Sequence, residues 1–228
     1  RITDAVINNF PESLEIINLN SCQNISAFNI NHLVNLKEIN CGRSRITDAV
    51  INNFPESLEI INLNSCQNIS AFNINRLVNL KEIHCGGSRI TDAVINNFPE
   101  SLKIIDISWC QNILAFNINH LVNLKKISCV ESRITDAAIN NFPKSLKIID
   151  ISSCQNISNI NLKHLINLKE IECIKSSITD SAINNFPGSL EIINLNGCEN
   201  ISAFNINHLV NLKQIGSGGS PITDAAIN

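Results

Sequence analysis

The sequence predicts an α/β solenoid, a right-handed stack of ten short coils with a parallel β-sheet on the concave face and short helices on the convex face. The first observation is a fixed period, because the tetrapeptide Arg-Ile-Thr-Asp begins at Arg1 and returns 44 residues later at Arg45. The second is that each unit divides into two related coils of 22 residues, and the third is an alternation of apolar and polar residues in each coil. A period of this length is typical of repeat proteins, whose units pack mainly on their neighbours.

The repeats organise the 228 residues into one array rather than into separate globular domains. They comprise residues 1–44, 45–88, 89–132, 133–176 and 177–220, with a partial copy at 221–228. The end units of a solenoid are usually altered to shield its apolar interior. Neither end of this sequence carries such a change, so we expect an uncapped excerpt of a longer array, or an array that makes end-to-end contacts.

Each repeat contains two strand signals, one in each coil. The first coil (coil A) has the pattern Leu14-x-x-Ile17-x-Leu19-x-x-Cys22-x-x-Ile25, and the second (coil B) has Leu36-x-x-Ile39-x-Cys41-x-x-Ser44-x-Ile46. The alternation of Ile17 with Leu19, and of Ile39 with Cys41, is the period of a strand with one buried face. Because each strand returns after one circuit, the ten strands should lie parallel and about 4.8 Å apart in one sheet.

The two coils differ in the segment that follows the strand. After coil B, Asp48 is placed to cap a short helix whose Ile51 and Phe54 share one face, and Pro55 prevents its extension. After coil A, the segment 25–33 has mixed apolar spacing and is interrupted by asparagines, for which we expect a short helix or a 3₁₀ turn.

Nine cysteines follow the same period, alternately 19 and 25 residues apart. They are Cys22, Cys41, Cys66, Cys85, Cys110, Cys129, Cys154, Cys173 and Cys198. Their number is odd, and Ser217 stands where the next one would fall, which argues against a disulfide framework. No Cys-x-x-Cys pair suggests a metal site. We expect small buried thiols in a reducing, intracellular compartment, either of the producing cell or of a host cell that receives the protein.

The two coil patterns together resemble the cysteine-containing subfamily of leucine-rich repeats, best known from the substrate-receptor arms of F-box proteins. The resemblance covers the whole chain and implies a horseshoe-shaped solenoid that binds other proteins. It also implies that Cys22 and its equivalents bond to backbone groups inside their own coil. In coil B a serine takes this place and offers a hydroxyl for the same bond; these serines are Ser44, Ser88, Ser132, Ser176 and Ser220. No F-box-like segment is present, so the catalytic link of a ubiquitin ligase is missing from this sequence.

Several classes of function are excluded by charge and spacing. A net charge of −3 and a pI near 6.0 give no basic footprint for nucleic acid, and no apolar run is long enough to span a membrane. Four histidines recur every second coil, about 10 Å apart, too far to share a metal ion. They are His32, His120, His164 and His208. No acid–base pair or phosphate loop stands outside the repeat pattern, so we expect neither an enzyme nor a cofactor.

The candidate binding site lies in the middle of the concave face, where the copies differ. One expected row is Asn18, Asn40, Asn62, His84, Asp106, Ser128, Asp150, Glu172, Asn194 and Gly216, which is acidic at its centre. The only tryptophan, Trp109, falls in the next row, where most other coil A copies carry serine. An exposed aromatic among carboxylates is typical of an interface hot spot for a basic or amphipathic partner. The predicted site comprises Trp109, Asp106, Glu131, Asp150, Glu172, His84, Val130 and Ile174.

Alternatives to this site remain open. Trp109 also suits a packing role in a groove between coils, the variation among copies also suits neutral drift, and the row Lys103, Lys125, Lys147 and Lys169 also suits simple balance of the acids. The sequence therefore favours a non-catalytic scaffold that binds a protein or peptide on its concave face, as the recognition arm of a larger protein. The alternative is a structural protein whose nearly identical repeats assemble end to end into a fibre or surface layer.

The 44-residue period can be tested by deletion. Removing residues 45–88 recreates an existing junction, so the shortened protein should keep its circular-dichroism spectrum and its cooperative unfolding. Removing only residues 45–66 places two like coils together and should cost clearly more stability. Equal loss of structure in the two deletions would contradict the two-coil unit.

Overall fold

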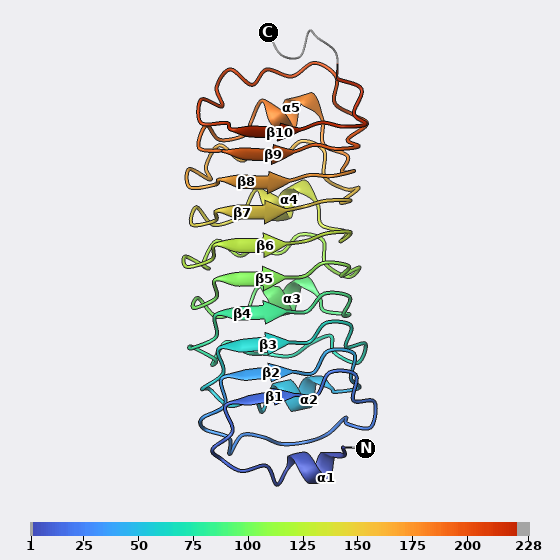
Figure 1. The fold of residues 1–228 in the computed structure, drawn as a ribbon, viewed down its shortest axis with the longest axis vertical. Helices are drawn as coiled ribbons and strands as arrows, with labels where there is room; N and C mark the ends of the chain where they lie inside the picture. The colour runs from blue at the N-terminus through green and yellow to red at the C-terminus, as the bar shows by residue number, and fades with distance from the viewer. Residues whose placement is uncertain (1, 223–228) are drawn as a thin grey trace.

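The computed structural model describes residues 2–222, which form one solenoid with a single ten-stranded parallel sheet (Figure 1). The strands are β1 Ile16–Asn18, β2 Glu38–Asn40, β3 Ile60–Asn62, β4 Glu82–His84, β5 Ile104–Asp106, β6 Lys126–Ser128, β7 Ile148–Asp150, β8 Glu170–Glu172, β9 Ile192–Asn194 and β10 Gln214–Gly216. They follow one another in chain order, and each residue pairs with the residue 22 positions further on. The predicted ten coils and their parallel stacking are confirmed.

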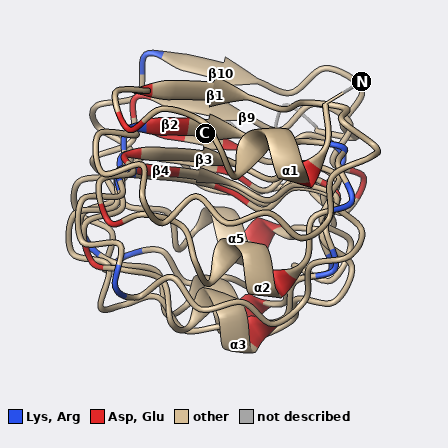
Figure 2. Ribbon diagram, turned by 90° about the horizontal axis from the view of Figure 1, so that it is seen from below, with Lys and Arg blue, Asp and Glu red and all other residues tan. Residues whose placement is uncertain are grey.

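The strands are short, and their middle residues point inward. Ile39 and Ile61 are fully buried, whereas the first and third residues of the strands face outward. The sheet therefore has an open face, called the sheet face below, made of two outward rows. In Figure 2, which looks along the stack, β1 and β10 lie farther toward this face than β3 and β4, so the sheet face is the concave one.

Within residues 2–222, five one-turn helices lie behind the sheet, on the opposite side of the solenoid (Figures 1 and 2). They are α1 Asp4–Ile7, α2 Asp48–Ile51, α3 Asp92–Ile95, α4 Asp136–Ile139 and α5 Asp180–Ile183. As predicted, Ile51 and Phe54 are buried. None of the described helices is long and apolar enough to cross a membrane.

The predicted capping role of Asp48 is wrong. Thr47 is the N-cap of α2, and it makes no capping bond with its side chain. The carboxylate of Asp48, the first helical residue, instead accepts hydrogen bonds from the backbone N–H groups of Ser70 (2.9 Å) and Ala71 (3.1 Å) in the next coil. The same bonds join Asp92 to residues 114 and 115. This aspartate therefore fastens one coil to the next rather than starting a helix.

The helix or 3₁₀ turn predicted after coil A is also wrong, because the segment 25–33 forms bends and turns instead. The backbone N–H of Asn31 donates to the side-chain oxygen of Asn29 (3.0 Å). The N–H of Asn29 donates to the side chain of Asn8 in the preceding coil (2.7 Å). Asparagine side chains thus take the hydrogen bonds that a helix would need, which is their usual mode of competition with helical structure.

The cysteines are free, and all except Cys22 are buried. The implied bond inside the coil is replaced by a bond between coils, since the thiol of Cys66 donates to the carbonyl oxygen of Cys41 in the preceding coil (3.1 Å). In coil B the hydroxyl of Ser88 does bond inside its coil, to the carbonyl of Cys85 (2.6 Å). The Cys85 carbonyl also accepts the thiol of Cys110 (3.3 Å), so both ladders share one acceptor.

The terminal coils of the described chain leave apolar side chains open to solvent. Ile215 in β10 is 40% exposed, whereas Ile193 in β9 is 1% exposed, because β10 has no neighbouring strand on its outer side. Cys22, in the first coil, is only half-buried. Residues 223–228 of the predicted partial repeat lie outside the described residues.

The burial of the thiols leads to a test of accessibility. Burial raises the pKa of the thiols at Cys41, Cys85, Cys129 and Cys173, which lowers their reactivity further. In native protein without reductant, a thiol reagent should label Cys22 first, and denaturation should release nine reactive groups. Cys22→Ser should remove the fast phase alone. Seven or fewer groups after denaturation would reveal a disulfide.

Candidate functional site

The outer row of the sheet face has the order that the sequence predicts. The third residues of consecutive strands stand side by side, so that His84 pairs with Asp106, Ser128 with Asp150, and Asp150 with Glu172. Neighbouring side chains in the row are separated by about one strand spacing, ~4.8 Å. The three carboxylates and the histidine therefore lie on one face, within the five consecutive strands β4 to β8.

His84 forms the charged centre of this row. Its Nδ1 lies 3.8 Å from a carboxylate oxygen of Asp106, and its Nε2 lies 3.8 Å from one of Glu82. The hydrogen bond with Asp106 is the main cause that raises the pKa of His84 above 6.5. Partial burial favours a higher pKa for Asp106, but hydrogen bonds with His84 and Ser108 outweigh it and lower that pKa. The raised pKa of His84 and the lowered pKa of Asp106 both widen the pH range over which the two side chains form an ion pair.

Asparagine and aspartate in this row also have a structural role that sequence patterns did not reveal. Asp106 accepts the backbone N–H of Ser108 (3.0 Å), and Asp150 accepts that of Ser152 (3.0 Å). Asn40 does the same for Gly42 (3.0 Å). These bonds close the turn after the strand. One oxygen of each acid is therefore used locally, and the other oxygen of Asp106 faces His84.

Trp109 follows β5 at a backbone position that is left-handed in every coil. Its φ is 63°, and the corresponding residues Ser21, Arg43, Ser65, Gly87, Glu131, Ser153, Lys175, Gly197 and Gly219 also have positive φ values. The side chain of Trp109 is 55% exposed and borders a groove of about 620 Å³. The groove is also lined by Asp106, Val130 and the glycines at 86 and 87. Trp109 thus lies largely in solvent, with space beside it where Gly86 and Gly87 carry no side chains.

Val130 and Ile174 replace glycine for a packing reason. At Gly42 an added Cβ would lie 2.9 Å from the side-chain oxygen of Asn20, and at Gly86 it would lie 3.2 Å from that of Asn64. In front of Val130 and Ile174 the preceding coil carries serine, at 108 and 152, instead of asparagine. The shorter serine leaves room for the branched side chain. The apolar centre of the sheet face thus depends on paired changes in adjacent coils.

The predicted site residues do not all meet in one place. Trp109, Asp106 and Val130 line the groove, and His84 contacts Asp106. Asp150 ends β7, while Glu172 ends β8 and Ile174 follows it, about 10 and 14 Å along the stack from Asp106. Partial burial raises the pKa of Glu172, and the charges of Asp150 and Glu170 contribute. Glu131 is exposed in the left-handed turn after β6.

The inner row of the sheet face was missed by the sequence prediction. It contains an outward isoleucine at the first position of every coil A strand, namely Ile16, Ile60, Ile104, Ile148 and Ile192. The signal was present, because two adjacent isoleucines such as Ile104 and Ile105 cannot both face inward on one strand. The coil B strands carry a charged or polar residue at the same position, so the isoleucines of this row alternate with Glu38, Glu82, Lys126, Glu170 and Gln214.

A row of lysines borders the isoleucines at the start of the strands. At its ends the lysines pair within the row, where Lys81 contacts Glu59, and Lys169 lies 2.8 Å from Glu191. Hydrogen bonds from Lys169 and Lys213 lower the pKa of Glu191 to about 2. Between these ends, Lys103, Lys125 and Lys147 form no ion pair with any described residue. These three lysines are therefore not paired with the acids of the outer row, which lie at the other end of the strands.

The four recurring histidines have structural bonds. The Nε2 atom of each lies 3.0–3.1 Å from the carbonyl oxygen of a phenylalanine in the preceding coil, as for His164 and Phe142. Arg76 takes the same place in the second repeat and donates to Phe54. Within residues 2–222 no group of three or more His, Cys, Asp or Glu side chains is placed to hold a metal ion.

The His84–Asp106 pair can be tested by titration. Asp106→Asn keeps the turn, since asparagine stands in this row at positions 18, 62 and 194, but it removes the main cause of the raised pKa. The pKa of His84 should fall toward 6.5 in an NMR titration, while the His32 ring signals should coincide in both proteins. An unchanged His84 curve would exclude the pair.

The same pair should contribute to stability in a defined pH window. The contribution of His84 is present below its unfolded pKa and is lost as the pH rises through its raised folded pKa. That of Asp106 is present above its unfolded pKa and is lost as the pH falls through its lowered folded pKa. Asp106→Asn should therefore lower the Tm more at about pH 5 than at about pH 8.

Similarity to known proteins is found in the structure and not in the sequence. No family model and no curated protein matches this sequence. Among solved structures, the leucine-rich-repeat domain of APL1 superposes with a TM-score of 0.73 at 14% identity, over 96% of this chain and 59% of that one. A chain from the octameric complex of Latrophilin 3, Unc5D and FLRT2, in which FLRT2 contributes the leucine-rich repeats, has a TM-score of 0.69 at 19% identity, over 93% and 77%.

An internalin, InlF of Listeria monocytogenes, is similar as well, with a TM-score of 0.58 at 21% identity, over 89% of this chain and 68% of that one. The chain thus spans about three fifths of the APL1 domain and two thirds or more of the other two. At identities this low, the structural similarity establishes the fold but not the activity. The parallel sheet, the 22-residue register and these neighbours show that the chain has the leucine-rich-repeat fold, with cysteine-containing repeats.

Proposed function

We propose that this protein is a non-catalytic scaffold that binds a protein or peptide on the sheet face. The observation that carries the proposal is Trp109, a large aromatic side chain that is more than half exposed beside an open groove in the variable centre of the array. Single exposed aliphatic residues are common, but an exposed tryptophan next to a groove is typical of an interface anchor. The FLRT2 repeats, which share the fold, are part of a protein complex.

The charges of the sheet face favour a partner with a basic and an apolar side. Asp106, Asp150 and Glu172 line the strand ends, whereas the unpaired lysines line the strand starts. The outward isoleucines lie between the two. A bound segment should therefore place its Lys or Arg side chains over the strand ends, near Trp109, and its apolar side chains over Ile104 and Ile148.

The buried free thiols favour a reducing, intracellular setting for this interaction. End-to-end assembly into a fibre is the second candidate, and exposure of Ile215 in the last strand supports it. That candidate gives no role to Trp109 or to the acidic row. We therefore favour peptide recognition on the sheet face over end-to-end assembly.

The anchor role of Trp109 can be tested with peptides selected from a random displayed library against the intact protein. Selected peptides should be rich in basic and apolar residues. Trp109→Ser should raise their Kd about tenfold or more, roughly 1.4 kcal/mol, because a rigid aromatic buries a large area at small entropic cost. Serine is the matched replacement, since it occupies the same left-handed position at 21, 65 and 153.

Leu114→Ser serves as the control. Leu114 is 45% exposed in the same coil but lies after the turn, away from the sheet, and other copies carry serine there. This variant should bind the peptides normally. If Trp109→Ser instead lowers the Tm by many degrees and leaves peptide affinity unchanged, Trp109 is a packing residue and the proposed site is wrong.

The acidic row should act mainly on association. Glu172→Lys reverses a charge that lies about 14 Å from Asp106, beyond direct contact with the groove. Stopped-flow mixing with a basic peptide should show slower association, and the difference should fade as salt rises, because screening shortens the reach of the charge. An effect confined to dissociation would contradict a steering role.

A further inference from the structure

A second surface of the solenoid, behind the strand starts, carries one exposed aliphatic residue in every repeat. These residues, called the knobs below, are Val34, Val78, Val122, Ile166 and Val210, and they are 60–81% exposed. Nearby positions change in the fourth repeat, where Asn159 and Lys163 replace alanine and asparagine, but the knob there becomes a larger aliphatic, Ile166. A solvated position tolerates polar residues at no cost, so five aliphatic side chains in a row indicate a contact.

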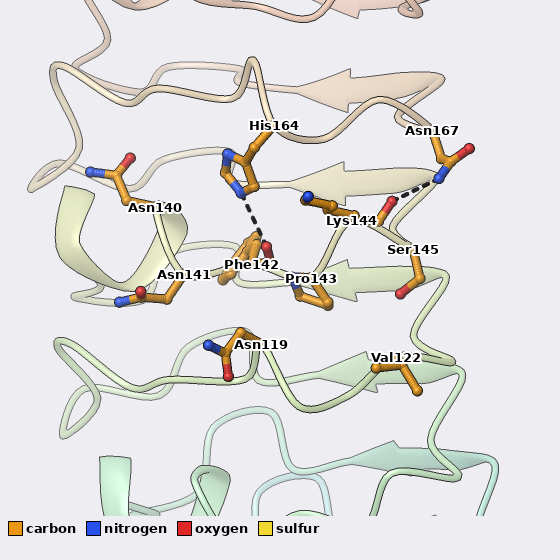
Figure 3. Close-up of a pocket in the computed structure, with 10 residues that line it drawn as sticks. All are labelled: Asn119, Val122, Asn140, Asn141, Phe142, Pro143, Lys144, Ser145, His164 and Asn167. Carbon is orange, nitrogen blue, oxygen red and sulfur yellow. Dashed lines mark hydrogen bonds between the residues drawn. The ribbon is translucent and has the colours of Figure 1, made fainter.

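Recesses lie beside two of the knobs, Val78 and Val122. Figure 3 shows the recess between Val122 and His164, with Phe142 and Pro143 of the intervening coil as its floor. Its volume is about 510 Å³, and the preceding repeat has one of about 520 Å³ between Val78 and His120, with Pro99 in its lining. The upper rim is held in place because His164 bonds to the Phe142 carbonyl (3.1 Å) and Asn167 donates to that of Lys144 (2.9 Å).

Knobs and recesses alternate along the stack with one period. Successive knobs are two coils apart, about 10 Å, and the recesses at Pro99 and Pro143 each lie one coil, about 5 Å, from the knob before them. The row of five is therefore about 40 Å long, and a width of about 20 Å would bury the ~800 Å² per partner typical of specific interfaces. Only a partner with the same period can fill all recesses at once, and the partner that has this period is another copy of the chain.

We propose that this surface joins two copies of the chain side by side, in antiparallel orientation, with the knobs of each copy in the recesses of the other. A two-fold axis along the stack would set knob against knob. A two-fold axis across the stack, midway between the coils of β5 and β6, sets Val78 and Val122 against the two recesses, at Pro143 and Pro99 respectively. It places Val34, Ile166 and Val210 at the levels of Pro187, Pro55 and Pro11.

The charges beside the recesses favour the same orientation. The prolines of the first three repeats are followed by Glu12, Glu56 and Glu100, whereas the later part of the row carries Lys144 and Lys163. In the antiparallel pair Glu56 stands at the level of Lys163 of the other copy, while a parallel pair would place glutamate near glutamate. Arg76 and Lys144 share a level, but the guanidinium of Arg76 is turned to the carbonyls of its own chain and to Glu56 (4.0 Å).

The curvature decides which knobs carry most of the contact. The sheet face is concave, so the surface behind it is convex, and two convex surfaces touch most closely near the axis. Val78, Val122 and Ile166 lie nearest the axis and should dominate. Both sheet faces remain open in such a pair, so this inference does not depend on the proposed peptide site, and each can fail alone.

The pairing can be tested by sedimentation equilibrium of the full chain between about 1 and 200 µM. The wild type should be a dimer, and the triple variant Val78→Ser, Val122→Ser, Ile166→Ser should be a monomer with the same circular-dichroism spectrum. Leu114→Ser, the matched exposed aliphatic on another surface, should remain a dimer. A monomeric wild type over the whole range, or a triple variant that stays dimeric, would overturn the proposal.

Charge exchange tests the orientation. Glu56→Lys and Lys163→Glu should each raise the dimer Kd about fivefold or more, and the double variant should restore it, because Glu56 and Lys163 of opposite copies face each other only in the antiparallel pair. Absence of rescue would overturn the orientation. Loss of association in Ile215→Ser, with the knob variant unaffected, would assign association to the ends of the stack and overturn the proposal.

Discussion

The coils of this protein are held together by hydrogen bonds whose partners stand 20–25 residues apart in the chain. The strands supply part of them, in a register that advances by 22 residues at each step. Side chains supply the rest: the carboxylate of Asp48 binds N–H groups of the next coil, His164 binds the Phe142 carbonyl, and the amide of Asn167 binds that of Lys144. A buried or half-buried backbone group without a partner is costly, and three-residue strands leave most of each coil without a ladder. The chain therefore repeats a polar residue wherever a loop passes over its neighbour.

This constraint separates the fixed from the variable part of the molecule. The residues that bond across coils and the apolar interior recur in each repeat, because any change disturbs two neighbours at once. Freedom remains in the outer row of the sheet and in the left-handed turn that follows each strand. There the backbone is fixed by its own hydrogen bonds, as in the turn that Asp106 closes with Ser108. A side chain such as Trp109 can change without cost to the framework. Variation is thus concentrated on the concave face by the same bonding that holds the stack together.

The two surfaces differ in a way that suits two uses. The sheet face varies from coil to coil, and its apolar centre required paired changes such as Ser108 with Val130. The knob surface keeps one exposed aliphatic residue in every repeat, and recesses lie beside Val78 and Val122, so its main feature is its regular spacing. A varied surface fits one particular partner, whereas a periodic surface fits another copy of itself.

By itself, the sequence determined the period, the ten parallel strands, the buried cysteines and the order of residues along the outer row. These follow from alternation and spacing, which are local properties of the chain. The tertiary structure alone decided the role of Asp48, the turns after coil A, the outward position of Ile104 and the recess beside Val122. Each of these depends on what the adjacent coil presents at one level of the stack. Asn8, for example, takes the N–H of Asn29 that a helix would have used, and no pattern within one coil contains that competitor. Propensity was overruled wherever a hydrogen-bond partner 20–25 residues away was better placed than a neighbour in sequence.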